Sequence, residues 1–522
     1  MERQRKTAKN TSHNRRGRVK ESKRSKRNRF GTVCIVIQTI ASIALMIVLN
    51  LLGMIPLKYL ILVAVLLFFF WCITLNSQVA RRKKGTFGKV FSLLLTFCLF
   101  IGSYYVAEAN DMISRITGGN YKVDKMIVAV RADDPAETLE DAADYTFGVQ
   151  FSKGSDNMQA AVSDIQKQIG SEIQTTECDS VQTQAQQLLD EEVDAIIYNG
   201  AYTSLMEENV TDFSKKIKIL YTFDIRVQLD FGNSGATDDS ITKEPFTIYI
   251  SGIDTYGEVS ETSRSDVNLI AVVNPKTYQI LLVTTPRDYY VPIPGVSGGQ
   301  KDKLTHAGIY GIDASMRTLG ELYETDINYY ARLNFTSLID IVDTLGGVDV
   351  YSELAFQTGT ESGCIVDVQE GWNHLNGEQA LAFSRERHAL ADGDNQRGKN
   401  QQAVLTAMLR KCLSPTMLLK AGTIMNQVSS EVETNLSQAQ INSLIKYQLN
   451  KNATWTIQSV AATGTNDKGY CYSSGDTPLF IMDPDEDVVQ EIIDLANVVE
   501  EGGTLKDRSE ERRVGKECRS RW

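Results

Sequence analysis

The sequence predicts an α/β protein in three parts: a membrane anchor of three N-terminal helices, a small α/β accessory domain, and a larger domain with a mixed β-sheet covered by helices. Three observations lead to this prediction. Three apolar stretches lie near the N-terminus of the 522-residue chain. Strand-like and helix-like segments alternate over the remainder. One pair of strand-like segments is joined by a four-residue turn, which requires an antiparallel pair in the second sheet.

The N-terminal region has the pattern of a multi-pass membrane anchor. Residues 1–30 carry thirteen Lys and Arg against two Glu and contain no apolar run, which is typical of a basic tail. The apolar stretches at 31–54, 59–75 and 90–107 each approach the ~20 residues that cross a bilayer. Positive charge in the tail and in the loop Arg81–Lys84 places both in the cytoplasm. We therefore predict a multi-pass cell-membrane protein with extracellular C-terminal domains, in preference to a cleaved signal peptide.

The chain beyond the anchor is strongly acidic, because many of its 54 Lys and Arg lie in the tail and loop while most of its 65 Asp and Glu do not. This charge argues against generic binding to nucleic acid or anionic lipid. Four His and eight Cys show no zinc-like spacing. Cys364 and Cys471 lie in strand-like, Gly/Ser-rich surroundings, and we predict that they form a disulfide. Residues 508–522 match a translated sequencing adapter and are excluded from the fold interpretation.

Residues 109–240 are predicted to form the accessory domain. We expect strands at MIVAVR, DAIIYNG and KIKILYTFDI, and helices at NMQAAVSDIQKQIG and VQTQAQQLLDEEV. The segment TLEDAADYTFGVQ is expected to form a helix that leads to a further strand. No catalytic constellation is visible here, so a ligand-binding or spacer role is expected. The Gly/Ser/Asp-rich stretch FGNSGATDDSITKEP marks the boundary to a domain at 241–500, which a tail at 501–522 follows.

The larger domain is expected to begin with three strands. FTIYISGID has the composition of a buried strand, and DVNLIAVV and YQILLVTTP flank the turn NPKT. INYYARLN predicts a further strand. Helices are expected at GIDASMRTLGELY, at TSLIDIVDTLG with a stop at Gly346, and at 394–411 and 436–449.

The hairpin should bring charged residues to one end of the sheet. With the turn at 274–277, Asp266 lies opposite about Thr285 and Arg264 opposite about Arg287. If FTIYISGID runs parallel to the second hairpin strand, Asp254 reaches the same end. Paired Asp oxygens beside arginines suit Mg²⁺ bridging to phosphate. A structural cluster of salt bridges explains the same spacing equally well.

The stretch FSRERHALADGDNQRGKNQQ, residues 383–402, concentrates positive charge in this acidic region. Asn376 and Gln379 have the spacing of a capping box that starts a short helix. If the chain then extends, Arg385 and Arg387 share one face and Glu386 points away.

The same stretch continues into a second helix. Gly393 allows a turn before it, and an acid can cap its N-terminus. The stripe that would face an anion at this helix end consists of Asp394, Arg397 and Gln401. Because the arginine fork matches phosphate oxygens, an anion site is favoured over a solvated surface.

Several blocks together resemble the LytR-CpsA-Psr family of cell-wall enzymes. They are IDTYGEVSETSRSDVNLIAVV, TPRDYYV, KDKLTHAGIYG and LNGEQALAFSRERHALADGDNQRGKNQQ, and the resemblance spans about 241–480. The tail, three spans and accessory domain are similar to those of the capsule-attaching members.

The resemblance implies a fold, an activity and a set of site residues. The implied enzyme is a membrane-anchored, Mg²⁺-dependent phosphotransferase that moves a glycopolymer, such as capsule or teichoic acid, from polyprenyl pyrophosphate to peptidoglycan. Asp254 and Asp266 match the Mg²⁺ ligands. The positions that match the pyrophosphate-binding arginines are Arg264, Arg287, Arg385, Arg387 and Arg397. Asp394 matches an acid that orients an arginine, and Gln401 matches a polar contact to the head group.

The remaining expectations follow from the same resemblance. Lys303 and His306 lie in a family-like block, and we expect Lys303 at the pyrophosphate and a structural role for His306. TSLIDIVDTLG and AVLTAMLRKCL are candidate walls for the lipid, although core packing explains any single residue there. A lipid-pyrophosphate hydrolase and a membrane-bound regulator that binds lipid-linked glycan without turnover are the alternative functions. The sequence identifies neither the polymer, the general base nor the oligomeric state.

Overall fold

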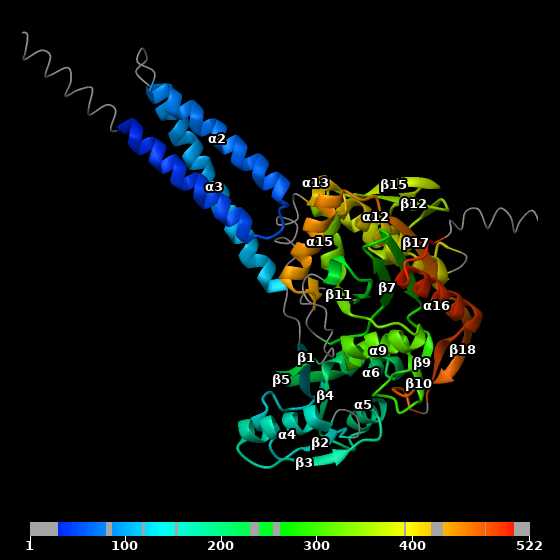
Figure 1. Ribbon diagram of the computed structural model, residues 1–522. Coiled ribbons are helices and arrows are strands. Elements are labelled where there is room, and N and C mark those ends of the chain that lie inside the picture. The colour runs from blue at the N-terminus through cyan, green and yellow to red at the C-terminus, as the bar shows by residue number, and fades with distance from the viewer. Residues whose placement is uncertain are drawn as a thin grey trace, which may run out of the picture. The chain divides into compact units, whose positions relative to one another are not determined.

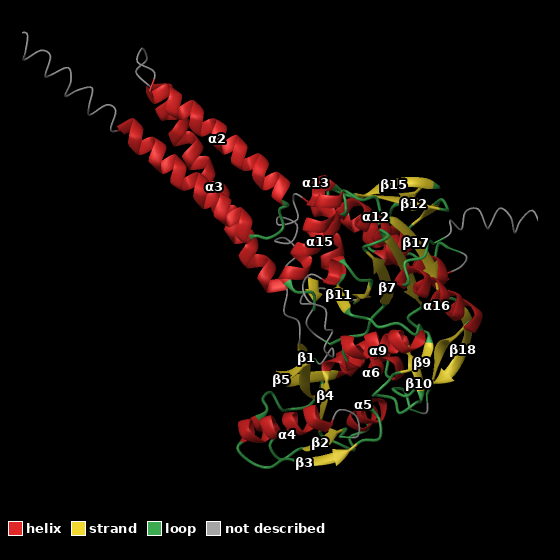
Figure 2. Ribbon diagram, in the orientation of Figure 1, coloured by secondary structure: helices red, strands yellow, loops and turns green. Residues whose placement is uncertain are grey.

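The computed structural model describes residues 30–79, 86–116, 121–151, 155–229, 240–253, 262–390, 393–418, 432–475 and 477–505. Only the backbone is described at 107–116, 121, 155–156, 393–395, 415 and 418. The basic tail, the loop Arg81–Lys84, Asp254 and residues 508–522 therefore lie outside the description. The chain divides into two compact units, one of residues 1–113 with 442–452 and the other of residues 114–441 with 453–522. Figures 1 and 2 show the elements of each.

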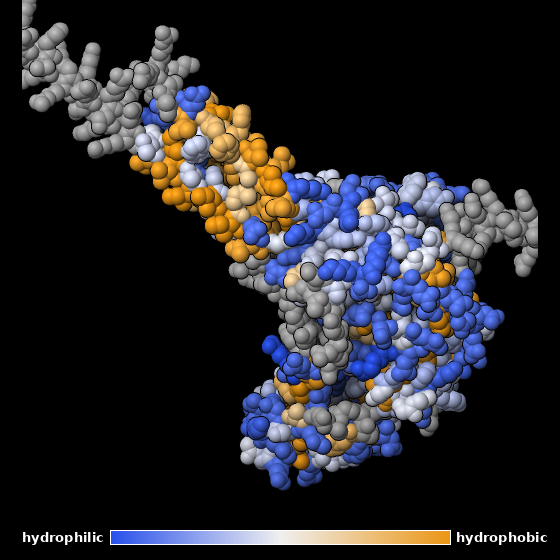
Figure 3. Space-filling model, in the orientation of Figure 1, coloured by the Kyte–Doolittle hydropathy of each residue, from blue (hydrophilic) through white to orange (hydrophobic). Residues whose placement is uncertain are grey.

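The first unit contains the membrane anchor. Its three apolar helical spans are Phe30–Leu51, Leu57–Gln78 and Thr86–Val106, and each is long and apolar enough to cross a membrane. The second and third belong to α2 (Leu57–Val79) and α3 (Thr86–Ile116). Many large apolar side chains on these helices are exposed, and they form the apolar surface in Figure 3. Such a surface is stable in lipid rather than in water, which confirms the predicted anchor.

The second unit contains two separate sheets, and the first lies within the predicted accessory domain. Its strand order is β3-β2-β4-β1-β5. The strands are β1 (Tyr121–Arg131), β2 (Thr146–Val149), β3 (Gln174–Glu177), β4 (Ala195–Asn199) and β5 (Ile217–Gln228). β1 is antiparallel to β4 and β5, whereas β2 is parallel to β3 and β4. β3 escaped the sequence interpretation because all four of its side chains are exposed and give no periodic signal.

Helices cover both faces of the accessory sheet. α4 (Ser155–Ile169) packs on the face of β1 that carries Met126 and Val128. Two further helices, α5 (Val181–Leu189) and α6 (Thr203–Asn209), pack on the other face, which carries Ile127 and Ala129. This division follows from the two-residue period of a strand. The short elements η2 (Gly200–Tyr202) and α7 (Phe213–Lys216) flank α6.

One predicted helix of this domain is wrong. The segment TLEDAADYTFGVQ forms only the 3₁₀ turn η1 (Glu140–Ala142) before β2. Asp141 accepts hydrogen bonds from the backbone amides of Glu137 and Thr138, and Asp134 accepts one from the amide of Ala136. These bonds satisfy amides at the start of the turn, and the chain enters β2 only four residues after the turn ends.

The second sheet is mixed, as predicted, and has the order β16-β11-β6-β7-β8-β17. Its strands are β6 (Phe246–Gly252), β7 (Val267–Asn274), β8 (Gln279–Thr285), β11 (Tyr329–Leu333), β16 (Val432–Thr434) and β17 (Thr456–Ala461). β7 is antiparallel to β6 and β8, and β16 is antiparallel to β11. β11 is parallel to β6, and β17 is parallel to β8.

The two faces of this sheet have different partners. Ile270, Val272, Leu281 and Val283 form a core with α9 (Ile312–Leu322) and α16 (Glu486–Glu500). The opposite face carries Ile250 and Leu269 and forms one wall of a cavity with three other helices. These helices are α10 (Phe335–Thr344), α11 (Gly377–Arg385) and α12 (Gly393–Cys412).

Short elements surround the sheet. The two-stranded pairs join β9 (Tyr290–Pro292) to β10 (Lys301–Lys303), β12 (Val348–Ser352) to β15 (Gly371–Leu375), β13 (Phe356–Gln357) to β14 (Asp367–Val368), and β18 (Gly464–Tyr470) to β19 (Pro478–Pro484). The helical elements are η3 (Ser240–Thr242), α8 (Leu304–Tyr310), η4 (Thr360–Ser362) and α13 (Pro415–Leu418). A further helix, α15 (Gln438–Lys451), belongs mostly to the first unit.

The hairpin register differs by two residues from the predicted one. Asn268, not Asp266, lies opposite Thr285. The pairing continues to Asn274 opposite Gln279, so the turn comprises residues 275–278 instead of 274–277. Tyr278 has a left-handed φ of 55°, and the Asn274 side chain accepts a hydrogen bond from the amide of Lys276. These local features move the turn by one residue toward the C-terminus. When the turn moves by one residue, the residue that lies opposite a given position changes by two, which accounts for the difference in register.

Candidate active site

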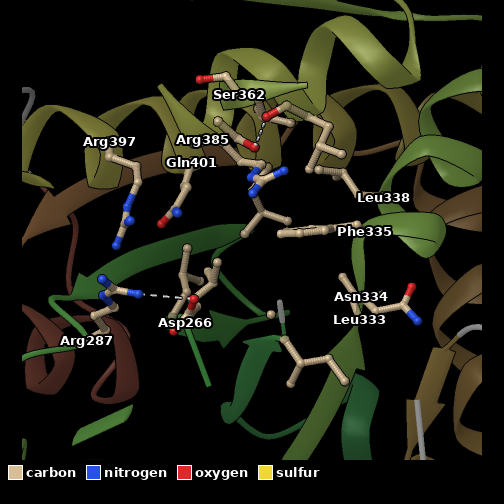
Figure 4. Close-up of a pocket in the computed structure, with 18 of the residues that line it drawn as sticks. Asp266, Arg287, Leu333, Asn334, Phe335, Leu338, Ser362, Arg385, Arg397 and Gln401 are labelled. Atoms are coloured by element: carbon tan, nitrogen blue, oxygen red, sulfur yellow. Dashed lines mark hydrogen bonds and ion pairs between the residues drawn. The ribbon is translucent and has the colours of Figure 1, made fainter. Parts of the chain in front are cut away.

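A cavity of about 270 Å³ lies between the second sheet and helices α10, α11 and α12. Its lining has a polar part and an apolar part. Six of the predicted site residues line it: Asp266, Arg287, Arg385, Arg387, Arg397 and Gln401. The apolar part of the lining includes Ile250, Leu269, Phe335, Leu338, Val404, Leu405 and Met408. Figure 4 shows Arg287, Arg397 and Gln401 around Asp266, with Arg385 between this group and Phe335 and Leu338.

Asp266 lies at the end of the sheet and contacts Arg287 directly. Its backbone amide donates to the carbonyl oxygen of Gly252 at 2.8 Å, which holds it beside the end of β6. Its Oδ2 accepts a hydrogen bond from Arg287 Nη1 at 3.2 Å, and its Oδ1 accepts a weaker one from Thr305 Oγ1 at 3.4 Å. The shifted register therefore brings Arg287, and not Arg264, to the cavity beside Asp266.

The capping box at Asn376 is present and starts α11. The helix continues to Arg385, and Glu386 is its C-cap. Glu386 is buried and accepts hydrogen bonds from the amides of Gly359, His388 and Ala389 and from Ser362 Oγ. Burial by itself would raise the pKa of Glu386, but these hydrogen bonds outweigh it and lower the pKa. The loop that carries Arg387 is thereby held around a buried carboxylate.

Arg385 has a defined aromatic neighbour. Its guanidinium carbon lies 4.4 Å from the centroid of the Phe335 ring, a cation–π distance. Phe335 is the first residue of α10, and Asn334 before it forms a capping box with Ser337. A capped helix end therefore orients the ring under the arginine.

Arg397 and Gln401 lie one helical turn apart on α12 and both line the cavity. The Asn400 side chain donates to the carbonyl oxygen of Phe383, which fixes α12 against α11. Asp394 was expected to cap α12, but the helix already begins at Gly393. The Asp394 side chain lies outside the description, so its contact with an arginine stays a prediction.

Arg264 and Lys303 line a neighbouring cavity of about 320 Å³, which shares Asp266 and Arg287 with the first. Arg264 Nη1 donates to Glu208 Oε1 at 2.7 Å, and Lys303 Nζ lies 2.7 Å from Asp288 Oδ1. Both bases are therefore paired with acids, and the predicted site is divided between two adjoining cavities.

His306 is fully buried beside the second cavity. Its Nδ1 lies 2.7 Å from Asp302 Oδ1 and 2.8 Å from Ser473 Oγ. Burial by itself would lower the pKa of His306, but attraction by Asp302 and Glu208 outweighs it and raises the pKa above its usual 6.5. Burial would likewise raise the pKa of Asp302, but attraction and hydrogen bonding by His306 lower it.

We expect His306→Gln to destabilise the protein more at pH 6 than at pH 9. A histidine whose folded pKa is raised contributes stability that is fully present below its unfolded pKa of about 6.5 and is lost as the pH rises through the folded value. Removing one partner of a buried ion pair costs about 3–5 kcal/mol. Thermal unfolding of the purified protein at the two pH values measures this. The exposed His374, paired with Asp349, offers the control His374→Gln. An equal loss of stability at both pH values would show that His306 is neutral.

The predicted Cys364–Cys471 disulfide is wrong. Both residues are free thiols. Cys364 Sγ contacts the carbonyl oxygen of Glu378, whereas Cys471 is buried in the loop after β18, where burial raises the pKa of its thiol to about 12. Cys364 and Cys471 thus lie in different parts of the domain, although the sequences around them have similar compositions.

The sequence interpretation missed Phe335 and Glu208 as site neighbours. Phe335 follows a recognisable cap, so the helix start could have indicated it. Glu208 comes from the accessory domain, and no local pattern connects it to Arg264.

Comparisons with known proteins show what this chain is similar to. The sequence model of the LytR_cpsA_psr family matches residues 196–481, more than half of the chain. The polyisoprenyl-teichoic acid–peptidoglycan teichoic acid transferase TagU of Bacillus cereus is 33% identical over 248 residues, 47% of this chain and 77% of the relative. The enzyme of the same description from Bacillus anthracis (strain CDC 684) is 35% identical over 247 residues, with the same coverage. The crystal structure of B. subtilis TagV is 25% identical and covers 50% of this chain and 99% of its own, with a TM-score of 0.42.

A second sequence model, that of a DNA polymerase processivity factor, matches residues 82–198. It covers less than a quarter of the chain and includes the apolar helix α3. We draw no family assignment from it.

The fold and the cavity define a class: an α/β protein with three helices apolar enough to cross a membrane, whose main sheet carries an arginine-rich cavity with an apolar part. Within this class the chain belongs to the LytR_cpsA_psr family.

Proposed function

We propose that this protein is a membrane-anchored phosphotransferase that moves a glycopolymer from a polyprenyl pyrophosphate carrier to peptidoglycan. The observation that supports this most is the single cavity with arginines on one side and apolar side chains on the other. A lipid pyrophosphate has the same division between an anionic head group and an apolar chain. The relatives' names, polyisoprenyl-teichoic acid–peptidoglycan teichoic acid transferase, describe a reaction of this kind. By the positive-inside rule, the two sheets would lie outside the cell.

The arginines supply charge neutralisation and alignment. Arg385, Arg387 and Arg397 come from α11, its C-terminal loop and α12, so they can approach the two phosphates from different directions. Phosphoryl transfer needs this electrostatic alignment more than covalent help. Arg385 is already fixed against Phe335, so little reorganisation is needed when the head group binds.

In the proposed reaction a muramic acid hydroxyl of peptidoglycan attacks the phosphorus atom that carries the glycan. The bond between that phosphorus and the bridging oxygen breaks, and polyprenyl phosphate leaves with the electron pair. The hydroxyl proton passes to a base. The product is a phosphodiester between glycan and peptidoglycan, so one phosphate stays with each product.

We also propose that Mg²⁺ assists this reaction. The Asp266 carboxylate at the sheet end, beside Arg287, fits a cation that is usually held by one or two carboxylates and by substrate oxygens. Among the described residues no cluster of three or more His, Cys, Asp or Glu forms a complete protein cage. Asp266, with Asp254 as predicted second ligand, would hold the ion, which when bound neutralises phosphate charge.

Incubation of the purified protein with Mg²⁺ and a glycan-bearing lipid pyrophosphate tests the function. We expect cleavage of the carrier and attachment of the glycan when peptidoglycan is added. Cleavage without attachment would instead favour the hydrolase. Binding without cleavage would favour the regulator and contradict both enzymatic functions.

We expect Leu338→Trp to impair the use of long carriers selectively. Leu338 lines the apolar part of the cavity, and an indole would occupy space that the lipid needs. Each CH₂ group that is no longer buried loses about 0.8 kcal/mol of binding free energy. Hence KM should rise about tenfold or more for a long polyprenyl carrier and far less for a geranyl carrier. Leu354→Trp, at an exposed leucine that does not line this cavity, is the control. Equal KM changes for both carriers would place the lipid elsewhere.

A further inference from the structure

The accessory domain reaches the polar end of the site through one side chain. Glu208 lies on α6, and its Oε1 accepts the hydrogen bond from Arg264 Nη1 at 2.7 Å. The side chains are 22% and 33% exposed, so the pair is partly screened from water. Arg264 is one of the arginines that the family pattern assigns to the pyrophosphate, and its partner Glu208 belongs to the accessory domain.

The contact lies in a packed junction between the two sheets. Ile309 of α8 is buried in the same core as α5 and α6 of the accessory domain. Thr262, two residues before Arg264, donates through its Oγ1 to Asp124 of β1 at 2.9 Å. Lys122 of β1 donates to the carbonyl oxygen of Tyr310 at 2.9 Å. The accessory domain thus contacts the chain on both sides of the Glu208–Arg264 pair.

The backbone around Arg264 is also fixed from the α8 side. A Cβ atom at Gly308 would lie 2.7 Å from the carbonyl oxygen of Ser263 and 2.8 Å from the amide nitrogen of Ser265. Only glycine allows this approach of α8 to the segment. The backbone position of Arg264 is therefore set by α8, while its guanidinium is held by Glu208.

Glu208 itself is supported from behind. His306 Nε2 lies 3.9 Å from the Glu208 carboxylate, and His306 Nδ1 contacts Asp302. The four side chains Asp302, His306, Glu208 and Arg264 form a row in which acids and bases alternate from the core to the cavity. Asp302 and His306 are fully buried, so the inner end of this row is rigid.

We propose that Glu208 is a positioning residue that orients Arg264 toward the pyrophosphate, so that the accessory domain is a functional part of the active site. This inference rests on the proposed function, because it takes lipid pyrophosphate as the ligand. His306 Nε2, 3.9 Å from the Glu208 carboxylate, places a second base beside this acid on the side away from the cavity.

Glu208 has two opposing effects on anion binding. As a negative charge it competes with the pyrophosphate for Arg264, but competition from a partly exposed pair is worth no more than about fivefold in affinity. As a fixed partner it removes the rotamer freedom of Arg264. Ordering a free arginine side chain on binding lowers the affinity by up to about twentyfold. The ordering effect is the larger, so loss of Glu208 should weaken binding.

Calorimetric titration of the full-length protein in detergent with geranyl pyrophosphate and Mg²⁺ tests this inference. We expect Glu208→Gln to weaken binding about tenfold and to lower kcat by a similar factor, and Glu208→Asp to restore part of both. In an Arg264→Ala background, Glu208→Gln should have no further effect, because it acts through Arg264. Asp212→Asn removes the same charge four residues along the chain from an acid paired with Lys215, and should leave binding and turnover unchanged.

Two results would overturn the positioning role. One is unchanged or tighter binding in Glu208→Gln, which would mean that charge competition dominates. The other is an equal loss in the Arg264→Ala background, which would mean a general defect of the domain junction. Tight binding without transfer by the wild type would contradict the proposed function alone. Absence of binding by the wild type would contradict both.

Discussion

Replacing Arg385 or Arg397 with alanine is expected to lower transfer about 10³-fold while the protein remains folded. Each arginine lines the polar part of the cavity from a different helix. Removing one preorganised hydrogen-bond donor at a site of developing charge typically lowers the rate about 10²–10³-fold. Removing an arginine that stabilises phosphoryl transfer lowers the rate further. Both side chains are only partly buried, so their removal should change the unfolding temperature little.

The measurement compares initial rates of glycan attachment and thermal unfolding for the wild type and each variant. Arg317→Ala is the control, because Arg317 is a half-exposed arginine on α9 that pairs with Asp313 and does not line the cavity. Wild-type activity in either Arg385→Ala or Arg397→Ala would refute the assignment of that arginine.

Asp266→Asn should lower transfer about 10²–10³-fold and alter the response to Mg²⁺. The amide is nearly isosteric but lacks the charge that holds Arg287 and that would bind the cation. We expect a chelator to stop the wild-type reaction and added Mg²⁺ to restore it, whereas the variant should need a much higher Mg²⁺ concentration.

A magnesium titration of both proteins checks this prediction. Asp349→Asn, at an exposed acid paired with His374, is the matched control. A wild type that is insensitive to chelation would contradict the Mg²⁺ proposal. Unimpaired transfer by Asp266→Asn would remove Asp266 from the site.

Local patterns predicted the parts of the site that depend on local chemistry. The capping box at Asn376 and the glycine stop at Gly346 are both present, because each satisfies helix-end groups within a few residues. The stripe with Arg397 and Gln401 points into one cavity because helical periodicity fixes relative direction.

The errors arose where distant or competing contacts decide the structure. The predicted register of the hairpin was wrong by two residues, because the left-handed conformation of Tyr278 is not evident from the sequence. The helix expected before Thr146 is only the turn η1, because the residues that follow pair with β3 and β4 in the sheet. Pairing Cys364 with Cys471 relied on similar composition, which does not report proximity. Glu208 could not be found because its partner, Arg264, belongs to another domain.

The central claim is that one cavity binds the pyrophosphate and the lipid of the carrier together. A crystal structure with geranyl pyrophosphate and Mg²⁺ tests it most directly. We predict that the phosphates contact Arg385, Arg387 and Arg397, and that the geranyl chain lies between α10 and α12 against Leu338 and Met408. Phosphates bound away from these arginines, or a chain outside this cavity, would contradict the account.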